Sequence, residues 1–526
     1  MKRIEAPCPS CGAPVVFTAS VSLATVCEHC GSAVARSDRK LEDLGKVAAL
    51  AETASPLALG IEGVYRGKSF VLVGRVQYQH ASGAVWDEWY AAFPNDRWGW
   101  LAEAQGRFMF TVNRQFKDIS RLPTVESLRP GAEIKLEDGP PYVVNEAGEA
   151  RLIAARGELP FRPDFSRLHR YADLSGEGKR FATLDFGGAS PAVFMGEMTS
   201  LAELRISPVI EDESQMVHLI GALPIACPKC GGVLEIHVPE RAERVICPYC
   251  HSASDFAEGN LIYLATSNEA QVKPLIPLGR TGKFRGAELM VIGFMQRSVR
   301  IEGVEYPWTE YLLHSQTLGF RWLVNDAGHW TYVDSVSPGE VRRSHTGATY
   351  AGRAYRLFQR CPATVRYVIG EFFWKVTVGE QTMVSDYIAP PESLSEEIAL
   401  FGQSSADGSA ASAGGSAAEV TFSHGVYVPH TEIAQAFAVR LYPPAWGVKP
   451  NQPNPVDQRI YVLCPVFVVL LFLLNTVIQW LRPAGTVDGA WLVWMVIGIV
   501  GVPLTAFLYQ NSFESQRWQD SHIERG

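Results

Sequence analysis

Residues 59–67 read LGIEGVYRG and residues 278–286 read LGRTGKFRG, so one pattern of leucine, glycines, an aromatic residue and Arg-Gly occurs twice. The two stretches are 219 positions apart, and the same offset relates Gly74 to Gly293. Self-similarity that extends well beyond one motif indicates a duplicated structural unit. We therefore predict two copies of one domain in this chain of 526 residues.

Each copy reads as a series of short strands. Residues 69–77 (SFVLVGRVQ) and 288–295 (ELMVIGFM) are apolar runs bounded by turn residues. Similar runs follow at residues 88–93, 107–112, 309–313 and 321–324. Strands at this spacing are typical of a small antiparallel barrel or sandwich. We expect a mainly β fold with two such domains, at 57–205 and 275–440, and short helices at 38–53 and 431–440.

Eight of the ten cysteines fall into two sets of paired C-x2-C motifs. The first set is Cys8, Cys11, Cys27 and Cys30, and the second is Cys227, Cys230, Cys247 and Cys250. Each C-x2-C turn can present two thiolates to one ion, and the spacing between the pairs matches a four-thiolate zinc site. We predict zinc ribbons at 1–37 and 222–256, each with one structural Zn²⁺, because four protein ligands leave no open position.

Other uses of these cysteines fit less well. Disulfides are rare in the reducing cytosol, where the topology below places both sets. A dithiol redox pair needs no second pair at this distance, and the spacings lack the unevenness of iron–sulfur motifs.

Polar residues that recur in both copies are candidates for a shared site. They are Arg66 and Arg285, Glu88 and Glu310, Glu158 and Glu371, together with Asp173 and Asp386. We interpret the arginines and glutamates as an ion pair or turn bond that holds each domain, and a small-ligand pocket remains an alternative. Histidines do not recur, and no nucleophile or phosphate-loop motif is present, so we expect no catalysis.

The C-terminal region indicates a membrane anchor. Residues 460–481 and 489–509 carry no formal charge, and each is long enough to cross about 30 Å of hydrocarbon as a helix. We predict a transmembrane hairpin at 460–510 that contacts lipid. A Pro-rich linker at 441–459 leads into the hairpin, and a tail at 511–526 follows it. Further upstream, we expect a flexible insert at 402–418 within the second domain.

Charges around the hairpin predict its orientation. Lys449, Arg459, Arg517 and Arg525 flank it on the side of both protein ends, and Arg482 alone lies in the turn. By the positive-inside rule, the N-terminal domains and the tail are expected in the cytosol. No signal peptide is expected, because the residues after Lys2 and Arg3 are not apolar.

Composition limits the partners. The 47 basic and 55 acidic residues give a net charge of −8, which argues against broad affinity for nucleic acid. Hydrophobic residues make up 47% of the chain and charged residues 19%, which excludes a disordered tail or coiled coil.

The L-G-x-x-G-x-[YF]-R-G start, the W-x-E-[WY] segment at Trp86 and Trp308, and the G-E-[LF] segment at Gly157 and Gly370 together resemble DUF4178, a bacterial family of uncharacterised domains. The resemblance covers about residues 57–205 and 275–440. It implies a frequent association with zinc ribbons and a location at the bacterial inner membrane. It also implies an accessory role near membrane-stress or polyamine-linked systems.

These observations leave three classes of function. We expect a membrane-anchored cytosolic scaffold that holds a protein partner near the bilayer. The alternatives are a module that binds nucleic acid or a small ligand, and an enzyme that uses Glu88 and Glu310.

Overall fold

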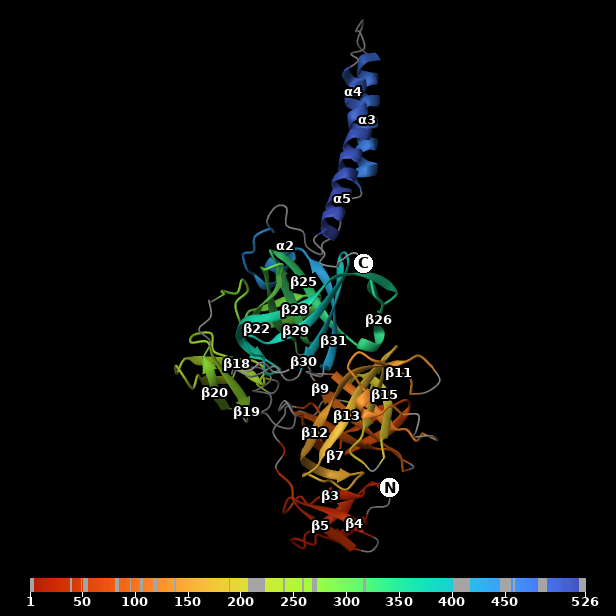
Figure 1. Ribbon diagram of the computed structural model, residues 1–526, viewed down its shortest axis with the longest axis vertical. Coiled ribbons are helices and arrows are strands. Elements are labelled where there is room, and N and C mark those ends of the chain that lie inside the picture. The colour runs from red at the N-terminus through yellow and green to blue at the C-terminus, as the bar shows by residue number, and fades with distance from the viewer. Residues whose placement is uncertain are drawn as a thin grey trace.

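The structure is a computed structural model, and it describes residues 4–37, 40–48, 50, 55–80, 85–94, 96–104, 107–116, 122–136, 139–188, 190–206, 223–239, 242–257, 260–266, 272–315, 318–400, 417–444, 456, 459–480 and 490–519. Figure 1 shows a column of parts, from a small N-terminal module through two large β-domains to a helical pair at the opposite end. A second small module lies beside the second β-domain. We call these parts the first cysteine module (4–46), the first barrel (62–199), the second cysteine module (223–266), the second barrel (281–428) and the helical pair (460–519).

The first barrel closes from eight antiparallel strands. In the order of their pairing, they are β7 (Lys68–His80), β8 (Val85–Ala92), β9 (Trp98–Ala104), β10 (Arg107–Asn113), β15 (Ala192–Thr199), β14 (Arg180–Asp185), β13 (Leu168–Gly176) and β12 (Tyr142–Leu159). Pairing of β12 with β7 completes the ring. Short strands β6 (Glu62–Tyr65) and β11 (Glu133–Ile134) and the turn η2 (Val125–Ser127) extend it.

The second barrel repeats this arrangement. Its strands are β22 (Ala287–Ile301), β23 (Val304–Ser315), β24 (Gly319–Asp326), β25 (His329–Val336), β31 (Ala417–Val428), β30 (Glu392–Leu400), β29 (Gln381–Ala389) and β28 (Arg353–Phe372), and β28 closes on β22. Strands β21 (Thr281–Phe284), β26 (Arg342–Arg343) and β27 (Gly347–Tyr350), the turn η3 (Pro338–Glu340) and helix α2 (His430–Phe437) accompany it. The predicted mainly β fold and the predicted duplication are confirmed.

A glycine marks the same bulge in both barrels. The register of β7 with β8 shifts between Leu72 and Gly74, and that of β22 with β23 shifts between Val291 and Gly293. A Cβ atom on Gly74 would lie 1.7 Å from the carbonyl oxygen of Glu158 on the neighbouring strand. Only glycine allows this approach of two backbones, which explains why the glycine recurs in the sequence.

The barrel interior can be assigned from its packing. Val76, Tyr90, Trp100, Leu152 and Phe194 come from five strands around the first barrel and meet in one buried cluster. Side chains that converge from so many strands of a closed ring must lie inside it. Because side chains alternate along a strand, residues two positions from these also point inward.

Each cysteine module consists of short hairpins. The first contains β1 (Ile4–Pro7), β2 (Pro14–Phe17), β3 (Ala24–Val26), β4 (Ser32–Ser37) and β5 (Lys40–Lys46), and the second contains β16 (Leu223–Ala226), β17 (Val233–Ile236), β18 (Arg244–Ile246), β19 (Ser252–Ala257) and β20 (Asn260–Thr266). The expected helix at 38–53 is wrong, because residues 40–46 pair with β4 as a strand. The spacing of Leu41 and Leu44 resembled a helical face, but Gly45 has φ +97° and the register shifts beside it.

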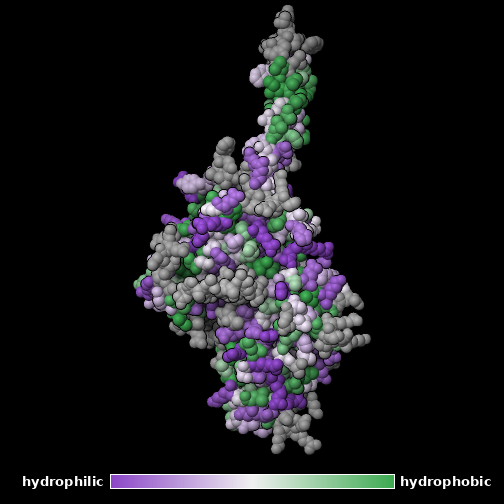
Figure 2. Space-filling view, viewed as in Figure 1, coloured by the Kyte–Doolittle hydropathy of each residue, from purple (hydrophilic) through white to green (hydrophobic). Residues whose placement is uncertain are grey.

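The C-terminal helices are α3 (Ile460–Trp480), α4 (Ala490–Val496), the π-helix η4 (Ile497–Gly501) and α5 (Val502–Gln519). Two segments, Ile460–Ile478 and Val493–Gln519, are long and apolar enough to cross a membrane. Figure 2 shows the apolar surface gathered along this pair. The helices pack closely at Gly498, where a Cβ atom would lie 2.5 Å from the Val468 side chain. The expected turn at 482–488, residues 402–416 of the insert, and most of the linker 441–459 lie outside the described residues.

Candidate metal centres and the polar sites of the barrels

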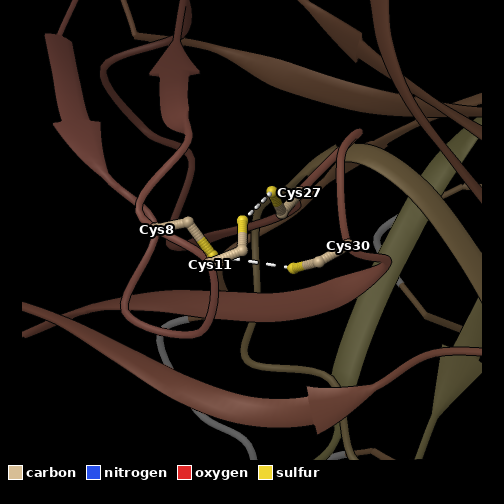
Figure 3. Close-up of side chains that lie close together, drawn as sticks. All are labelled: Cys8, Cys11, Cys27 and Cys30. Carbon is tan, nitrogen blue, oxygen red and sulfur yellow. Dashed lines mark hydrogen bonds between the residues drawn. The ribbon is translucent and has the colours of Figure 1, made fainter.

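The two sets of four cysteines each converge on one point. Within each set, the four sulfur atoms lie within 4.8 Å of one another. Cys8 and Cys11 lie in the turn between β1 and β2, and Cys27 and Cys30 lie in the turn between β3 and β4 (Figure 3). The second set occupies the same turns of its own module, between β16 and β17 and between β18 and β19. Each set could therefore hold a metal ion.

The backbone of each turn is shaped for two cysteines. Gly12, Gly31, Gly231 and His251 follow the four pairs and have φ values of +77°, +68°, +72° and +55°. Their N–H groups donate to the carbonyl oxygens of Cys8, Cys27, Cys227 and Cys247 at 2.8–2.9 Å. This left-handed conformation favours glycine, and His251 adopts it at the fourth position.

The thiols differ in exposure. Cys8 and Cys27 are buried, Cys11 is exposed and Cys30 is half-buried, and the second set repeats this order. The hydroxyl and N–H of Ser32 lower the pKa of Cys30 to about 6, which favours the thiolate that a metal requires. Ser252 occupies the corresponding place and lies 3.3 Å from Cys227 Sγ and 3.2 Å from Cys250 Sγ. Four sulfurs complete a tetrahedral set, so each centre suits a structural ion.

Glu158 joins the first cysteine module to the first barrel. Its carboxylate accepts hydrogen bonds from Thr18 N at 2.6 Å, Thr18 Oγ1 at 2.5 Å, Ala19 N at 3.0 Å and Ser22 Oγ at 2.6 Å. The side chain is buried, so these four donors replace the water that a carboxylate would otherwise bind. All four come from the segment that links β2 to β3.

Glu371 has the same function in the second copy. It accepts from His237 N at 2.8 Å and Val238 N at 2.9 Å, and His237 Nδ1 lies 2.8 Å from its Oε1. Strand pairing reinforces both junctions, since β3 pairs with the end of β12 at Glu158 and β18 pairs with the end of β28 at Glu371. We call these contacts the first and second module junctions.

Arg66 and Arg285 do not contact the recurring glutamates. Both lie in the tight turns that lead into β7 and β22, with φ values of +48° and +50°. Arg66 Nε lies 3.1 Å from Glu197, and the Arg285 guanidinium lies 4.9 Å from the centre of the Tyr332 ring. The arginines therefore stabilise turns at the barrel surface through these contacts.

Glu88 and Glu310 point into the barrel interiors. Glu88 accepts a hydrogen bond from Trp86 Nε1 at 3.1 Å, and Glu310 accepts one from Trp308 Nε1 at 2.6 Å. Asp173 and Asp386 lie in the same interiors, where Thr183 and Ser395 donate to them at 2.7 Å. Each barrel thus encloses a polar cluster at one end of its apolar core.

Some functional residues were missed in the sequence. Ser32 and Ser252 both stand two residues after the last cysteine of their set, so the repeat itself contained that signal. His237, Asp185 and Glu397 each correspond to a different residue type in the other copy, so identity between the copies does not reveal them.

The chain matches one known family of domains. It matches DUF4178, described as a domain of unknown function, over residues 58–200 and 277–414. These matches cover more than half of the chain, so it belongs to the DUF4178 family. Strand β31 of the second barrel lies beyond the second match.

No curated protein was found to match the chain. Among solved structures, the LG1-3 region of the laminin alpha2 chain matches at 10% sequence identity with a TM-score of 0.08. The match covers 77% of this chain and 58% of the laminin chain, which is less than two thirds of its length. A TM-score this low carries no argument about fold or function.

Replacing Glu158 by glutamine should weaken the first module junction. The amide group of glutamine would face N–H and O–H donors with a donor of its own, at a cost of about 2–3 kcal/mol. We expect the segment 18–26 to become sensitive to protease in the Glu158→Gln variant of the full chain. Glu149→Gln, at an exposed position of the same strand, is the matched control and should behave as the unaltered protein.

The second junction should depend on pH and the first should not. The hydrogen bond to Glu371 raises the pKa of His237 above its usual 6.5. Protonated His237 therefore stabilises the junction below pH 6.5, and this contribution is lost as the pH rises through the raised pKa. Protease sensitivity near residue 237 should increase from pH 6 to 9, and His237→Gln should abolish the trend. Equal trends at both junctions would contradict this assignment.

Proposed function

We propose that the protein is a membrane-anchored scaffold in a bacterial cell, with two zinc-stabilised modules and two barrels on the cytosolic side. The single observation that carries this proposal is that consecutive parts of the column are joined by specific contacts. A platform of this kind would present its binding surfaces at a fixed place relative to the bilayer.

The two barrels contact each other through η3. Gly339 N in this turn donates to Ser175 Oγ of the first barrel at 2.8 Å, and Arg342 lies 3.1 Å from Glu177. Arg343 also donates to the carbonyl oxygen of Gly131. A Cβ atom on Gly339 would lie 2.4 Å from the Ser175 backbone, so the two barrels touch at backbone distance.

The second barrel contacts the helical pair in turn. At the end of α5, Phe513 and Arg517 are buried. The Arg356 guanidinium of β28 lies 4.0 Å from the centre of the Trp518 ring, a favourable cation–π contact. These contacts support a scaffold whose barrels are held at the membrane by more than the linker 441–459.

Zinc is the metal that we propose for both centres. Four cysteine thiolates with no open position match structural Zn²⁺ in a reducing compartment. The ion would be coordinated by both hairpins of each module and so hold them in one arrangement. The module junctions would then fix each module against its barrel.

We propose the second cysteine module as the surface for a protein partner. Tyr249, Val233 and Ile262 of this module expose 66%, 61% and 56% of their surface, and apolar side chains that gather on one surface mark a protein-interaction site. Catalysis by Glu88 and Glu310 has less support, since each is held by a tryptophan hydrogen bond inside its barrel. Nucleic-acid binding has less support because the net charge is negative.

Metal analysis of the purified full chain should give two zinc ions per molecule. Cys11→Ser and Cys230→Ser should each lose one, because each removes an exposed ligand without changing the core. Cys361→Ser, outside both sets, is the control and should keep two. Another metal at stoichiometric amount, or full retention in both variants, would refute the assignment.

The orientation can be tested by labelling in intact cells. A membrane-impermeant thiol reagent should modify Thr486→Cys in the expected turn, and it should modify Ser512→Cys only after the membrane is opened. Ser512 is exposed in α5, three residues past the uncharged run that ends at Tyr509, so protection there reports the compartment. Labelling of Ser512→Cys alone in intact cells would reverse the proposed topology.

A further inference from the structure

The polar clusters inside the two barrels correspond residue by residue. Trp86 and Glu88 match Trp308 and Glu310, since each pair faces its neighbouring strand in the same register. Asp173 faces Thr183 as Asp386 faces Ser395, and Asp185 stands where the second barrel has Glu397. The two interiors are therefore independent versions of one site.

The second barrel carries its own cation in this site. Arg297 Nη1 and Nη2 lie 2.8 and 3.1 Å from the two carboxylate oxygens of Glu397, and Nη1 lies 3.3 Å from Glu310. The guanidinium also lies 5.8 Å from the centre of the Trp308 ring. The site is thus a receptor for a guanidinium group, formed by two carboxylates and an indole face.

The first barrel has Tyr78 where the second has Arg297. Tyr78 faces Trp86 across the strand pair as Arg297 faces Trp308, and the two rings stack with centroids 5.6 Å apart. In the described part of the chain, Glu88, Asp173 and Asp185 form no ion pair with a lysine or arginine. The first barrel therefore has carboxylates at the same positions as the second, but among the described residues no arginine corresponds to Arg297.

The carboxylates in the first barrel are buried and repel one another. Burial raises the pKa of Glu88 to about 7, and the charge of Asp185 adds to the effect. Burial, together with Glu146, raises the pKa of Asp173 to about 8. The other titratable groups near the cluster in the described residues are Glu146, Glu419, Tyr78, Tyr171, His169 and His80, and His80 lies 3.8 Å from Glu146. A cation beside such buried carboxyl groups favours their ionised form and lowers their pKa values.

We infer that the interior of the first barrel binds a small organic cation, with a guanidinium or primary ammonium group placed where Arg297 holds its guanidinium in the second barrel. Glu88 and Asp185 would bind the charged group and Trp86 would cover it. Tyr78 and Tyr171, the latter 5.6 Å from the Trp86 ring, would line the alkyl part. The interior of an eight-stranded barrel is filled by side chains or holds one small ligand, so a free solute fits better than a peptide. This inference goes beyond the scaffold function and does not depend on it.

Three probes distinguish the contribution of ligand charge to the binding affinity from that of ligand shape. The full chain in detergent is titrated by calorimetry with n-butylguanidinium, n-butylammonium and n-butylurea, the last being a neutral analogue of the first. We expect saturable binding of one n-butylguanidinium per chain and at least tenfold weaker binding of n-butylurea. The affinity should rise from pH 6 to 8, because binding requires the ionised carboxylates. The ammonium probe identifies which of the two charged groups is preferred.

Variants locate the binding in the first barrel. Tyr78→Arg would place a guanidinium in the site, as Arg297 does in the second barrel, and should abolish binding while raising the melting temperature. Glu149→Gln, at an exposed position of β12 outside the interior, is the control and should bind as the unaltered chain. Glu88→Gln and Asp185→Asn should each weaken binding at least tenfold, and they decide the question if Tyr78→Arg does not fold. No binding at millimolar n-butylguanidinium, equal binding of n-butylurea, or unchanged binding in Glu88→Gln and Asp185→Asn would overturn the inference.

Discussion

One buried carboxylate in each copy connects the cysteine module to the barrel. Glu158 accepts four hydrogen bonds from residues 18–22, and Glu371 accepts bonds from His237 and Val238. A carboxylate removed from water is stable only when its oxygens are fully bonded, so the loop before β3 and the end of β12 must hold each other in place. The cysteine module and the end of β12 that closes on Gly74 are therefore linked by this side chain, together with the pairing of β3 and β12.

The duplication has kept this connection and changed the chemistry of the interiors. The ring of strands, the bulge glycine and the Trp–Glu hydrogen bond are the same in both copies. Arg297 neutralises the acids of the second interior, and Tyr78 leaves those of the first without that cation. A structural ion pair in one copy and a ligand site in the other would be a simple division of roles after duplication.

The sequence predicted what depends on local pattern or on repetition. The strands at 69–77 and 288–295, the helix near 431 and the convergence of the cysteines all follow from short-range spacing. The helix at 38–53 was wrong because pairing with β4 overrode a weak apolar period. The partners of Glu158 and Glu371 could not be foreseen, since they lie more than a hundred positions away in the chain. Residues that recur in both copies do not reveal Arg297, because the corresponding residue of the first barrel is Tyr78.

Hydrogen exchange of the full chain, with and without a strong metal chelator, tests the linkage between metal centre and barrel most directly. Removal of the metal should speed exchange at Thr18 and Ala19 and also at the end of β12 near Glu158, because the junction couples them. Strand β10, which lies opposite β12 in the ring, should change little. Faster exchange confined to the cysteine module, with β12 unchanged, would contradict the account.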